Sequence, residues 1–508
     1  MSTEASHQGQ QLDGAVAGGL AWTASAKTAT QLITWLSALI VARLLSPADF
    51  GLVSMAGFFA NLTNVLAEFG LGSAALQMPE LDSDVIAQLN TISVASCTAA
   101  YGLAVLAAPL IAAFFKSNQL KLLVIVNSLG LLVTGFQAIP TGLLQKNLDY
   151  RRLSLVESVQ TLLMATVTIA CALAGFAYWS LVAGALAGRV GAAILTQWWM
   201  PVRLKLPRWK QVKAPVRMGA HVAVSRIASA VYVLSDGVIV GRMLGDSALG
   251  AYQLAMTFSS APADKIGALL MRVTGPLFAR VQDDLDLVRR YFRIVSECLS
   301  LAIFPLMVGL AMVAPEAVKV ILGPKWILAA GPIRWLALFI GVRDLSTLIV
   351  QVLTSLRHTR FTMLMSLLNI VVMPTAFMVA SHWGTSAVAA SWIVLSPITI
   401  LPLAVRLLRA IHMRYRDYIE VLAPSMMGSA VMVGALLALR PWLISSDIRE
   451  VVKLALQVGV GGVVYAGFLL IFYRGRLSRY ARFLMALRRG NSRLANSELG
   501  KIPDNSIP

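Results

Sequence analysis

The sequence predicts an all-α, polytopic membrane protein. Of its 508 residues, 57% are hydrophobic and 13% are charged, whereas soluble domains are about 45–50% apolar and about 25% charged. Apolar stretches follow one another along the chain, and each has roughly the 20 residues that a membrane-spanning helix needs. Two parts of the sequence also repeat each other. Together these observations predict about 14 transmembrane helices with a duplicated arrangement.

The expected spans follow one another with short connectors that carry polar or helix-breaking residues. Connectors of this kind include Ser46–Asp49, Lys116–Asn118 and Gly245–Ser247. The ranges that we assign to the spans are 16–44, 51–76, 88–115, 120–144, 153–175, 178–200, 216–243, 249–272, 294–314, 330–355, 361–381, 385–408, 419–439 and 451–473.

Lys and Arg are distributed unevenly over the connectors. Most of them lie in the loops that follow even-numbered spans and in the tail that begins at Arg474. The positive-inside rule therefore predicts that both termini are cytoplasmic. The formal net charge of +19 has the same origin. We interpret it as a sign of membrane topology and expect no nucleic acid among the partners.

The duplication aligns Ala38–Gly51 with Gly237–Gly250. The offset covers about six spans, and an even number means that both copies enter the membrane in the same direction. The predicted parts are a cytoplasmic N-terminal tail (1–15), a lobe of six spans (16–200), a basic cytoplasmic linker (201–215), a second lobe of six spans (216–408), two added spans (419–473) and a basic cytoplasmic tail (474–508).

Each copy carries cations inside an apolar stretch, and the same offset pairs Lys27 with Arg226 and Arg43 with Arg242. A Lys or Arg at the centre of a membrane helix costs roughly 3 kcal/mol, so such a group needs water, a carboxylate or an anionic ligand. Lys27 and Arg226 lie too deep to reach the interface, and we expect them to line a central cavity, with internal salt bridges as the alternative. Arg43 and Arg242 are secondary candidates, because they could also snorkel or cap the adjacent turn.

Polar residues flank both deep cations at nearly helical spacing, which indicates one polar stripe on each helix. In a membrane such a stripe should face protein or an aqueous cleft. Two cationic stripes facing each other would form a cavity suited to an anionic, hydroxyl-rich substrate. The stripes consist of Thr23, Lys27, Thr30, Gln31 and Thr34, and of His221, Ser225, Arg226, Ser229, Tyr232 and Asp236.

Acidic residues also occur in or near the spans: Glu68, Glu157, Asp236, Asp264, Glu297 and Asp344. Asp236 could neutralise a cation such as Arg242. Asp264–Lys265 and Arg343–Asp344 are sequence neighbours, which do not share a helix face, so we expect each residue to need its own partner. Charge balance is the ordinary role of these groups, and a proton or sodium site coupled to transport is the functional alternative. The sequence singles out none of them.

We find no catalytic motif in the sequence. P-loop, HExxH and GxSxG patterns are missing, the three cysteines lie in apolar stretches, and the five histidines lack metal-ligand spacing. We therefore expect no enzyme, metal or cofactor. Without a nucleotide site, the driving force would be an ion gradient, the membrane potential or the substrate gradient.

Several segments resemble a known family. Ala42–Leu52 (ARLLSPADFGL), Phe69–Gln77 (FGLGSAALQ), Gly142–Arg151 (GLLQKNLDYR) and Trp179–Val182 (WSLV) are similar to elements of Wzx/ExoT-type polysaccharide exporters. These exporters form the WzxC-like branch of the multidrug/oligosaccharidyl-lipid/polysaccharide (MOP) superfamily and include lipopolysaccharide biosynthesis proteins. The similarity covers roughly residues 15–410.

The resemblance implies a MOP/MATE-like bundle of two pseudo-symmetric six-helix lobes, V-shaped, with two extra C-terminal helices. It also implies a flippase of the bacterial inner membrane that moves an undecaprenyl-pyrophosphate-linked oligosaccharide by alternating access, for exopolysaccharide or O-antigen biosynthesis. By analogy, Lys27 and Arg226 would hold the pyrophosphate. A polysaccharide polymerase and a chain-length regulator are the implied protein partners.

Three other functions stay open. One is a MATE-like, ion-coupled multidrug exporter, although its cationic substrates would need acids where this sequence has Lys27 and Arg226. The second is a peptidoglycan-precursor (lipid II) flippase, and the third is a non-transporting scaffold for a polysaccharide synthase.

Overall fold

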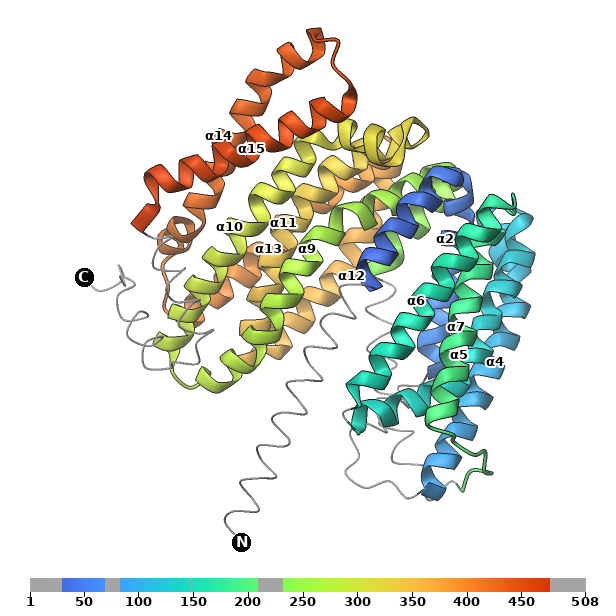
Figure 1. The fold of residues 1–508 in the computed structure, drawn as a ribbon. Coiled ribbons are helices and arrows are strands. Elements are labelled where there is room, and N and C mark those ends of the chain that lie inside the picture. Colours follow the sequence, from blue (N-terminus) through green and yellow to red (C-terminus); the bar gives the residue numbers. More distant parts are fainter. Residues whose placement is uncertain (1–29, 69–82, 148, 209–231, 476–508) are drawn as a thin grey trace. The chain divides into compact units, whose positions relative to one another are not determined.

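The computed structural model describes residues 30–68, 83–147, 149–208 and 232–475, and the regular structure in these ranges is helical (Figure 1). A helix over Thr30–Leu44 precedes α2, and residues 232–244 form a helix before α9. The remaining helices are α2 (Pro47–Glu68), α4 (Ser83–Phe115), α5 (Gln119–Lys146), α6 (Tyr150–Leu173), α7 (Trp179–Trp199), α9 (Asp246–Val281), α10 (Leu285–Ala317), α11 (Ala330–Ser355), α12 (Thr359–Ser381), α13 (Thr385–Ala410), α14 (Tyr415–Ser445) and α15 (Glu450–Phe472), with two short helical turns, Val318–Leu322 and Pro324–Ala329, before α11.

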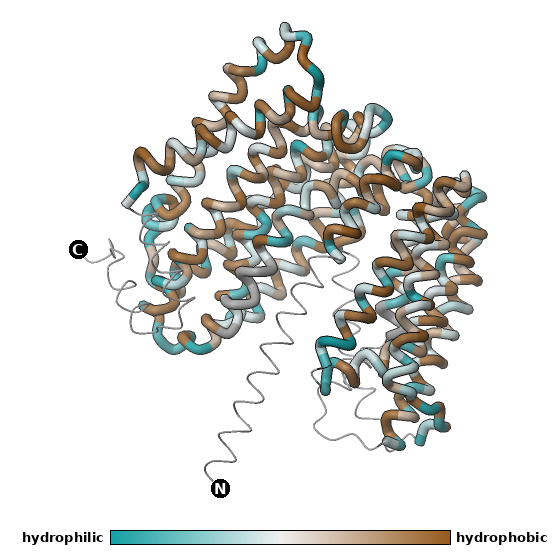
Figure 2. The backbone as a smooth tube through the Cα atoms, in the orientation of Figure 1, coloured by the Kyte–Doolittle hydropathy of each residue, from teal (hydrophilic) through white to brown (hydrophobic). Residues whose placement is uncertain are grey.

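Within the described ranges, 10 helices are long and apolar enough to cross a membrane. Figure 2 shows apolar residues along most of their length and hydrophilic residues gathered near many of the turns. Large apolar side chains are exposed on α12 and α15, for example Val371 and Ile471, as expected for surfaces that face lipid. The prediction of an all-α, multi-pass membrane protein is therefore confirmed, and the number of fourteen spans stays a prediction.

The contacts divide the chain into two compact units, residues 1–251 and 252–508. The division falls inside α9, whereas the sequence analysis placed a linker between two lobes at 201–215. The start of α9 belongs to the first unit because it packs on the start of α2, as described below. The predicted lobe boundaries stay a prediction.

Helix pairs in the first unit meet through small residues. On α7, Gly184 and Gly188 face the backbone of α6, and a Cβ at Gly188 would lie 2.7 Å from the carbonyl oxygen of Gln160. The lack of side chains at these two positions brings the helices into backbone contact. Close approach through small residues is how helices associate in lipid, where the hydrophobic effect between helices is missing.

The duplicated segments meet each other at their turns. The turn before α2 is a capping box, in which the Ser46 backbone N–H donates to Asp49 Oδ2 at 2.9 Å and Pro47 occupies the first helical position. The sequence analysis treated Ser46–Asp49 as a connector, whereas most of it is the first turn of α2. In the second copy, Gly245 has φ +89° and α9 begins at Asp246.

Two glycines at equivalent positions of the duplication form the contact between these turns. A Cβ on Gly51 would overlap the backbone carbonyl of Asp246, and a Cβ on Gly250 would overlap the backbone carbonyl of Pro47. The offset that pairs Gly51 with Gly250 also pairs Pro47 with Asp246, so the contact is reciprocal. The two copies therefore cross at a point where neither helix tolerates a side chain.

The second unit packs α10, α11 and α13 side by side, with α14 and α15 against α10 (Figure 1). A buried apolar cluster joins the end of α9 and the start of α10 to the ends of α11 and α13, with Phe278, Phe292, Leu348 and Leu407 among its members. Tyr465 of α15 donates a 2.8 Å hydrogen bond to the Leu301 carbonyl of α10. This bond and the packing of α14 on α10 hold the two C-terminal spans on the unit.

The helices α9 and α10 extend beyond the expected spans. The basic stretch 272–293 was predicted to be a loop, but α9 continues to Val281 and α10 begins at Leu285. Arg has a high helix propensity, so a helix does not end where the apolar stretch ends. The start of α10 is set by its N-cap, Asp284. Its carboxylate accepts from the backbone N–H groups of Asp286 and Leu287 at 3.1 and 3.0 Å.

We predict that Gly51→Ala lowers the thermal unfolding midpoint of the purified protein in detergent, because the added Cβ collides with the backbone of Asp246. Overpacking of this kind costs about 1–3 kcal/mol. Gly57→Ala on the same helix is the matched control, since nothing lies within 4 Å of its Cβ. It should keep or slightly raise the midpoint. Equal midpoints for the two variants would contradict the proposed contact.

Candidate functional site

The deepest cations that the sequence singles out, Lys27 and Arg226, lie outside the described residues, as does the side chain of Glu68 at the end of α2. The structure therefore leaves the predicted cavity cations as a prediction. The other candidates, Arg43, Arg242, Asp236, Asp264 and Lys265, lie in described segments.

Arg43 and Arg242 lie at the ends of the two duplicated helices, beside the turns that contact each other. Arg43 is exposed. The Arg242 guanidinium lies over the ring of Phe114 at the end of α4, 5.3 Å from its centroid. Phe114 in turn packs edge to face on the buried Phe115, with ring centroids 5.0 Å apart. A cation on an aromatic face at a helix end is a stabilising arrangement, and it fits a structural role for Arg242.

Asp236 is buried, with 3% of its surface exposed. Its Oδ1 accepts from the backbone N–H of Gly237 at 2.6 Å. It precedes Arg242 on the same helix, 232–244. A buried carboxylate in a span requires compensation, so Asp236 stays a candidate on the strength of its burial.

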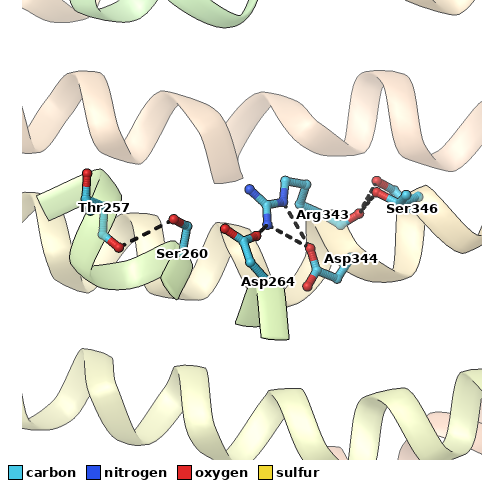
Figure 3. A network of polar contacts seen from close by, with 7 residues as sticks. Thr257, Ser260, Asp264, Arg343, Asp344 and Ser346 are labelled. Atoms are coloured by element: carbon cyan, nitrogen blue, oxygen red, sulfur yellow. Dashed lines mark hydrogen bonds and ion pairs between the residues drawn. The ribbon is translucent and has the colours of Figure 1, made fainter. Parts of the chain in front are cut away.

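The described charges that do meet inside the spans are Asp264 of α9 and Arg343 and Asp344 of α11 (Figure 3). Arg343 Nη2 lies 3.0 Å from Asp264 Oδ1 and 2.9 Å from Asp344 Oδ1. Arg343 Nε also donates to Asp344 Oδ1 at 3.0 Å. One guanidinium therefore binds two carboxylates and links the two helices.

The expectation that Arg343 and Asp344 would need separate partners was wrong. Adjacent residues project about 100° apart around a helix. The arginine side chain is long enough to fold back across this angle, and Asp264 of the neighbouring helix draws the guanidinium to the same place. The backbone carbonyl of Arg343 meanwhile accepts from Ser346 Oγ at 2.7 Å.

The two carboxylates of this cluster differ in environment. The side chain of Asp344 is 9% exposed and that of Asp264 is 58% exposed. Asp344 Oδ2 is buried and has no hydrogen-bond partner in the described part of the chain. It faces Gly267 of α9, where a Cβ would lie 3.6 Å from it. Lys265, beside Asp264, is exposed, and none of the described residues forms an ion pair with it.

The polar contact between α9 and α11 continues beyond the charges. Thr274 Oγ1 donates to Gln351 Oε1 at 2.8 Å. Gly275 gives space to the same glutamine, whose Nε2 lies 3.1 Å from the position of a Cβ. Asp344 and Gln351 are seven residues apart, so they share one face of α11. We call this contact, formed by Asp264, Arg343, Asp344, Thr274 and Gln351, the α9–α11 polar seam.

Arg189, near the middle of α7, is a further cation inside a span that is absent from the candidates predicted from the sequence. Its guanidinium occupies the space that a side chain at Gly130 of α5 would fill. This space exists because α5 and α7 pack against each other. That pairing is a tertiary contact and cannot be predicted from the spacing of residues along the chain.

The fold and these contacts define a class: a polytopic helical membrane protein with ion-paired charges inside its spans, a feature of transport proteins. A family model described as polysaccharide biosynthesis protein matches residues 40–331, which is more than half of the chain. The chain belongs to this family. The resemblance to Wzx/ExoT-type polysaccharide exporters, stated from short motifs, is thereby confirmed.

One curated relative is the succinoglycan biosynthesis transport protein ExoT of Rhizobium meliloti (strain 1021). It is 24% identical over 464 residues, which cover 90% of this chain and 93% of the relative. Among solved structures, the lipid II flippase MurJ in an inward closed conformation has a TM-score of 0.70 at 14% identity, over 90% of this chain and 99% of MurJ. An inward-facing multidrug resistance MATE family transporter of the MOP superfamily has a TM-score of 0.58 at 14% identity, over 75% of this chain and 95% of that one. At these identities the two structures establish a shared fold only.

We predict that Arg343→Gln destabilises the protein more than Arg334→Gln, a matched change on the same helix outside the cluster. The substitution leaves the buried Asp344 without its cation. Removing one partner of a buried pair costs about 3–5 kcal/mol, and the partial exposure of Arg343, at 34%, favours the lower end of that range.

The measurement is the thermal unfolding midpoint of both variants in the same detergent. Adding Asp344→Asn to Arg343→Gln should recover part of the loss, because the uncompensated charge is then gone. Equal midpoints for Arg343→Gln and Arg334→Gln would mean that the cluster contributes nothing to stability.

Proposed function

We propose that this protein is a flippase that moves an undecaprenyl-pyrophosphate-linked oligosaccharide across the bacterial inner membrane for the biosynthesis of an exopolysaccharide or O-antigen. Membership of the polysaccharide biosynthesis protein family carries the proposal. The name of ExoT describes a transport protein of succinoglycan biosynthesis, and the alignment with it covers nearly the whole length of both chains.

The fold supports transport rather than catalysis. In the described ranges 10 helices have the length and composition of membrane spans, and the MurJ and MATE structures share the fold. A lipid-linked oligosaccharide has a polar head that must cross an apolar layer about 30 Å thick. A helical bundle with polar groups inside and apolar groups outside meets that need, because the head can pass through the interior while the polyprenyl tail stays in lipid.

We assign the binding of the pyrophosphate to Lys27 and Arg226, on the sequence argument of matched depth in the two copies of the duplication. Hydrogen bonds between cationic side chains and phosphate oxygens are charge-assisted, about twice as strong as neutral ones. Arg43 and Arg242 would then lie outside the binding site. In this arrangement the two six-helix lobes alternate between inward-open and outward-open states, and both termini lie in the cytoplasm.

The transport cycle needs a source of energy other than nucleotide hydrolysis by this chain, because the sequence contains no GxxxxGK[ST] motif. An ion gradient, the membrane potential or consumption of the flipped substrate by a polymerase would each supply it. Partners of the flippase are accordingly a polysaccharide polymerase and a chain-length regulator.

We predict that Lys27→Ala and Arg226→Ala each abolish polysaccharide export in a strain that lacks the chromosomal gene. Loss of the cation removes the charge-assisted contact to the pyrophosphate. The measurements are the amount of polymer outside the cell, the amount of lipid-linked oligosaccharide retained in the membrane, and the amount of inserted protein by immunoblot. The retained lipid-linked oligosaccharide should rise as the exported polymer falls.

Lys121→Ala is the control, since Lys121 is an exposed cation at the start of α5 and should leave export unchanged. Full export by both single variants and by the double variant would reject the assignment of the two cations. If deletion of the gene stopped cell-wall growth, the substrate would be lipid II. If deletion changed only the tolerance of the cells to ethidium, the protein would be a drug exporter.

A further inference from the structure

We propose that Asp344 is a proton-binding site, with the proton carried on Oδ2 and with Arg343 and Asp264 as the groups that set the charge around it. The sequence left open whether any intramembrane acid takes up an ion. The α9–α11 polar seam selects one acid. The proposal stands on the geometry of this seam and is independent of the substrate.

The charges of the cluster do not balance. With both carboxylates ionised, the cluster of Asp264, Arg343 and Asp344 carries one negative charge in excess. Asp344 lies near the middle of α11, about 21 Å from its first residue at 1.5 Å per residue. An uncompensated charge at the centre of a span is costly. One proton makes the cluster neutral without moving any helix.

Of the two carboxyl groups, Asp344 is the one more favourable for protonation. Burial penalises the charged form of a carboxyl group, and the side chain of Asp344 is 9% exposed against 58% for Asp264. Only Oδ1 of Asp344 accepts from Arg343. The O–H bond can therefore form at Oδ2, which has no described partner, while both contacts from Arg343 to Oδ1 persist.

Among the described residues, few charged groups meet at the site. Arg343 contacts Asp344 directly, and Asp264 of α9 shares the same guanidinium. From α10, the side chains that face Gly341, one turn from Asp344, are the apolar Met307 and Ile303. The neighbouring helices carry further titratable groups among the described residues, which include Lys265 of α9, Glu297, Cys298 and Glu316 of α10, Arg360 at the start of α12, and Arg406 and Arg409 near the end of α13.

A proton fits this site better than a metal cation. Metal cations such as Na⁺ take several oxygen ligands, whereas Oδ2 has no polar partner among the described residues and faces Gly267, which has no side-chain oxygen. The guanidinium of Arg343 at Oδ1 would also repel a second cation. We therefore propose a proton as the ligand. Binding of sodium is one of the outcomes that would contradict the proposal.

The face of α11 that carries Asp344 has further polar residues toward the end of the helix. Gln351 and Ser355 continue the face of α11 on which Asp344 lies. Ser355 lines a cavity of about 380 Å³ at the end of the helix, together with Gln282, Asp283 and His358. Between Asp344 and Gln351 the same face carries the buried, apolar Leu348, and Thr274 donates a hydrogen bond to Gln351 from α9.

The test is infrared difference spectroscopy on the full-length protein in lipid vesicles, titrated from alkaline to acidic pH in the absence of substrate. The wild-type protein should gain a carbonyl stretching band of a protonated, weakly hydrogen-bonded carboxylic acid. Asp344→Asn should lose this band completely. Asp264→Asn removes the excess negative charge, so its band should form only at more acidic pH than in the wild type.

Asp286→Asn is the matched control, because Asp286 is 82% exposed and pairs with Arg289 at the start of α10. It should keep the band. Persistence of the band in Asp344→Asn, or its absence from the wild type, would overturn the proposal, as would a band that follows sodium concentration at constant pH. If Asp344→Asn fails to fold, an unshifted titration in Asp264→Asn overturns it instead. Failure of polysaccharide export would bear on the proposed function and leave this result unaffected.

Discussion

A charge that leaves water for the interior of a bilayer has to be neutralised by its immediate neighbours, and this constraint governs the polar groups of the protein. Helices satisfy the backbone within each span, so the remaining cost falls on ionisable side chains. Arg343 meets it by binding two carboxylates, one on its own helix and one on α9. The Arg242 guanidinium lies at a helix end over an aromatic ring, and its buried Nη1 has no hydrogen-bond partner in the described part of the chain. Because of the same constraint, an excess charge inside the bundle needs a ligand that neutralises it.

Glycines serve two different purposes in this fold. At Gly51, Gly250 and Gly188 the missing side chain lets one helix touch the backbone of another, and these positions fix where helices cross. At Gly267 and Gly275 the missing side chain leaves room for polar groups of the neighbouring helix. In a bilayer, where close packing and hydrogen bonds drive association, the first kind builds the bundle and the second lets it carry polar groups inside.

The proposed transport of a lipid-linked oligosaccharide and the proposed proton site are connected by physics but rest on different observations. The former rests on family membership and a fold shared with two transporters. The latter rests on an unequal pair of carboxylates around one guanidinium. Protonation would weaken the electrostatic attraction of Arg343 to Asp344 relative to its attraction to Asp264, while the contacts with Oδ1 persist. A change of this kind between two helices is the sort of local event that biases a bundle between two states.

Composition, apolar stretches and the duplication were enough to predict a multi-pass helical membrane protein, because the bilayer imposes a length and a polarity that are visible residue by residue. The family could be predicted from motifs because a motif such as Ala42–Leu52 is a contiguous segment of the sequence. The partner of Arg343 could not be predicted, because Asp264 reaches it only through the packing of α9 on α11. Nor could the contact of Gly51 with Asp246, which depends on where two helices cross. The sequence by itself determined which segments cross the membrane and which charged residues are energetically costly there. Only the tertiary structure decided which of these residues meet, because contacts between distant segments depend on helix packing and not on spacing along the chain.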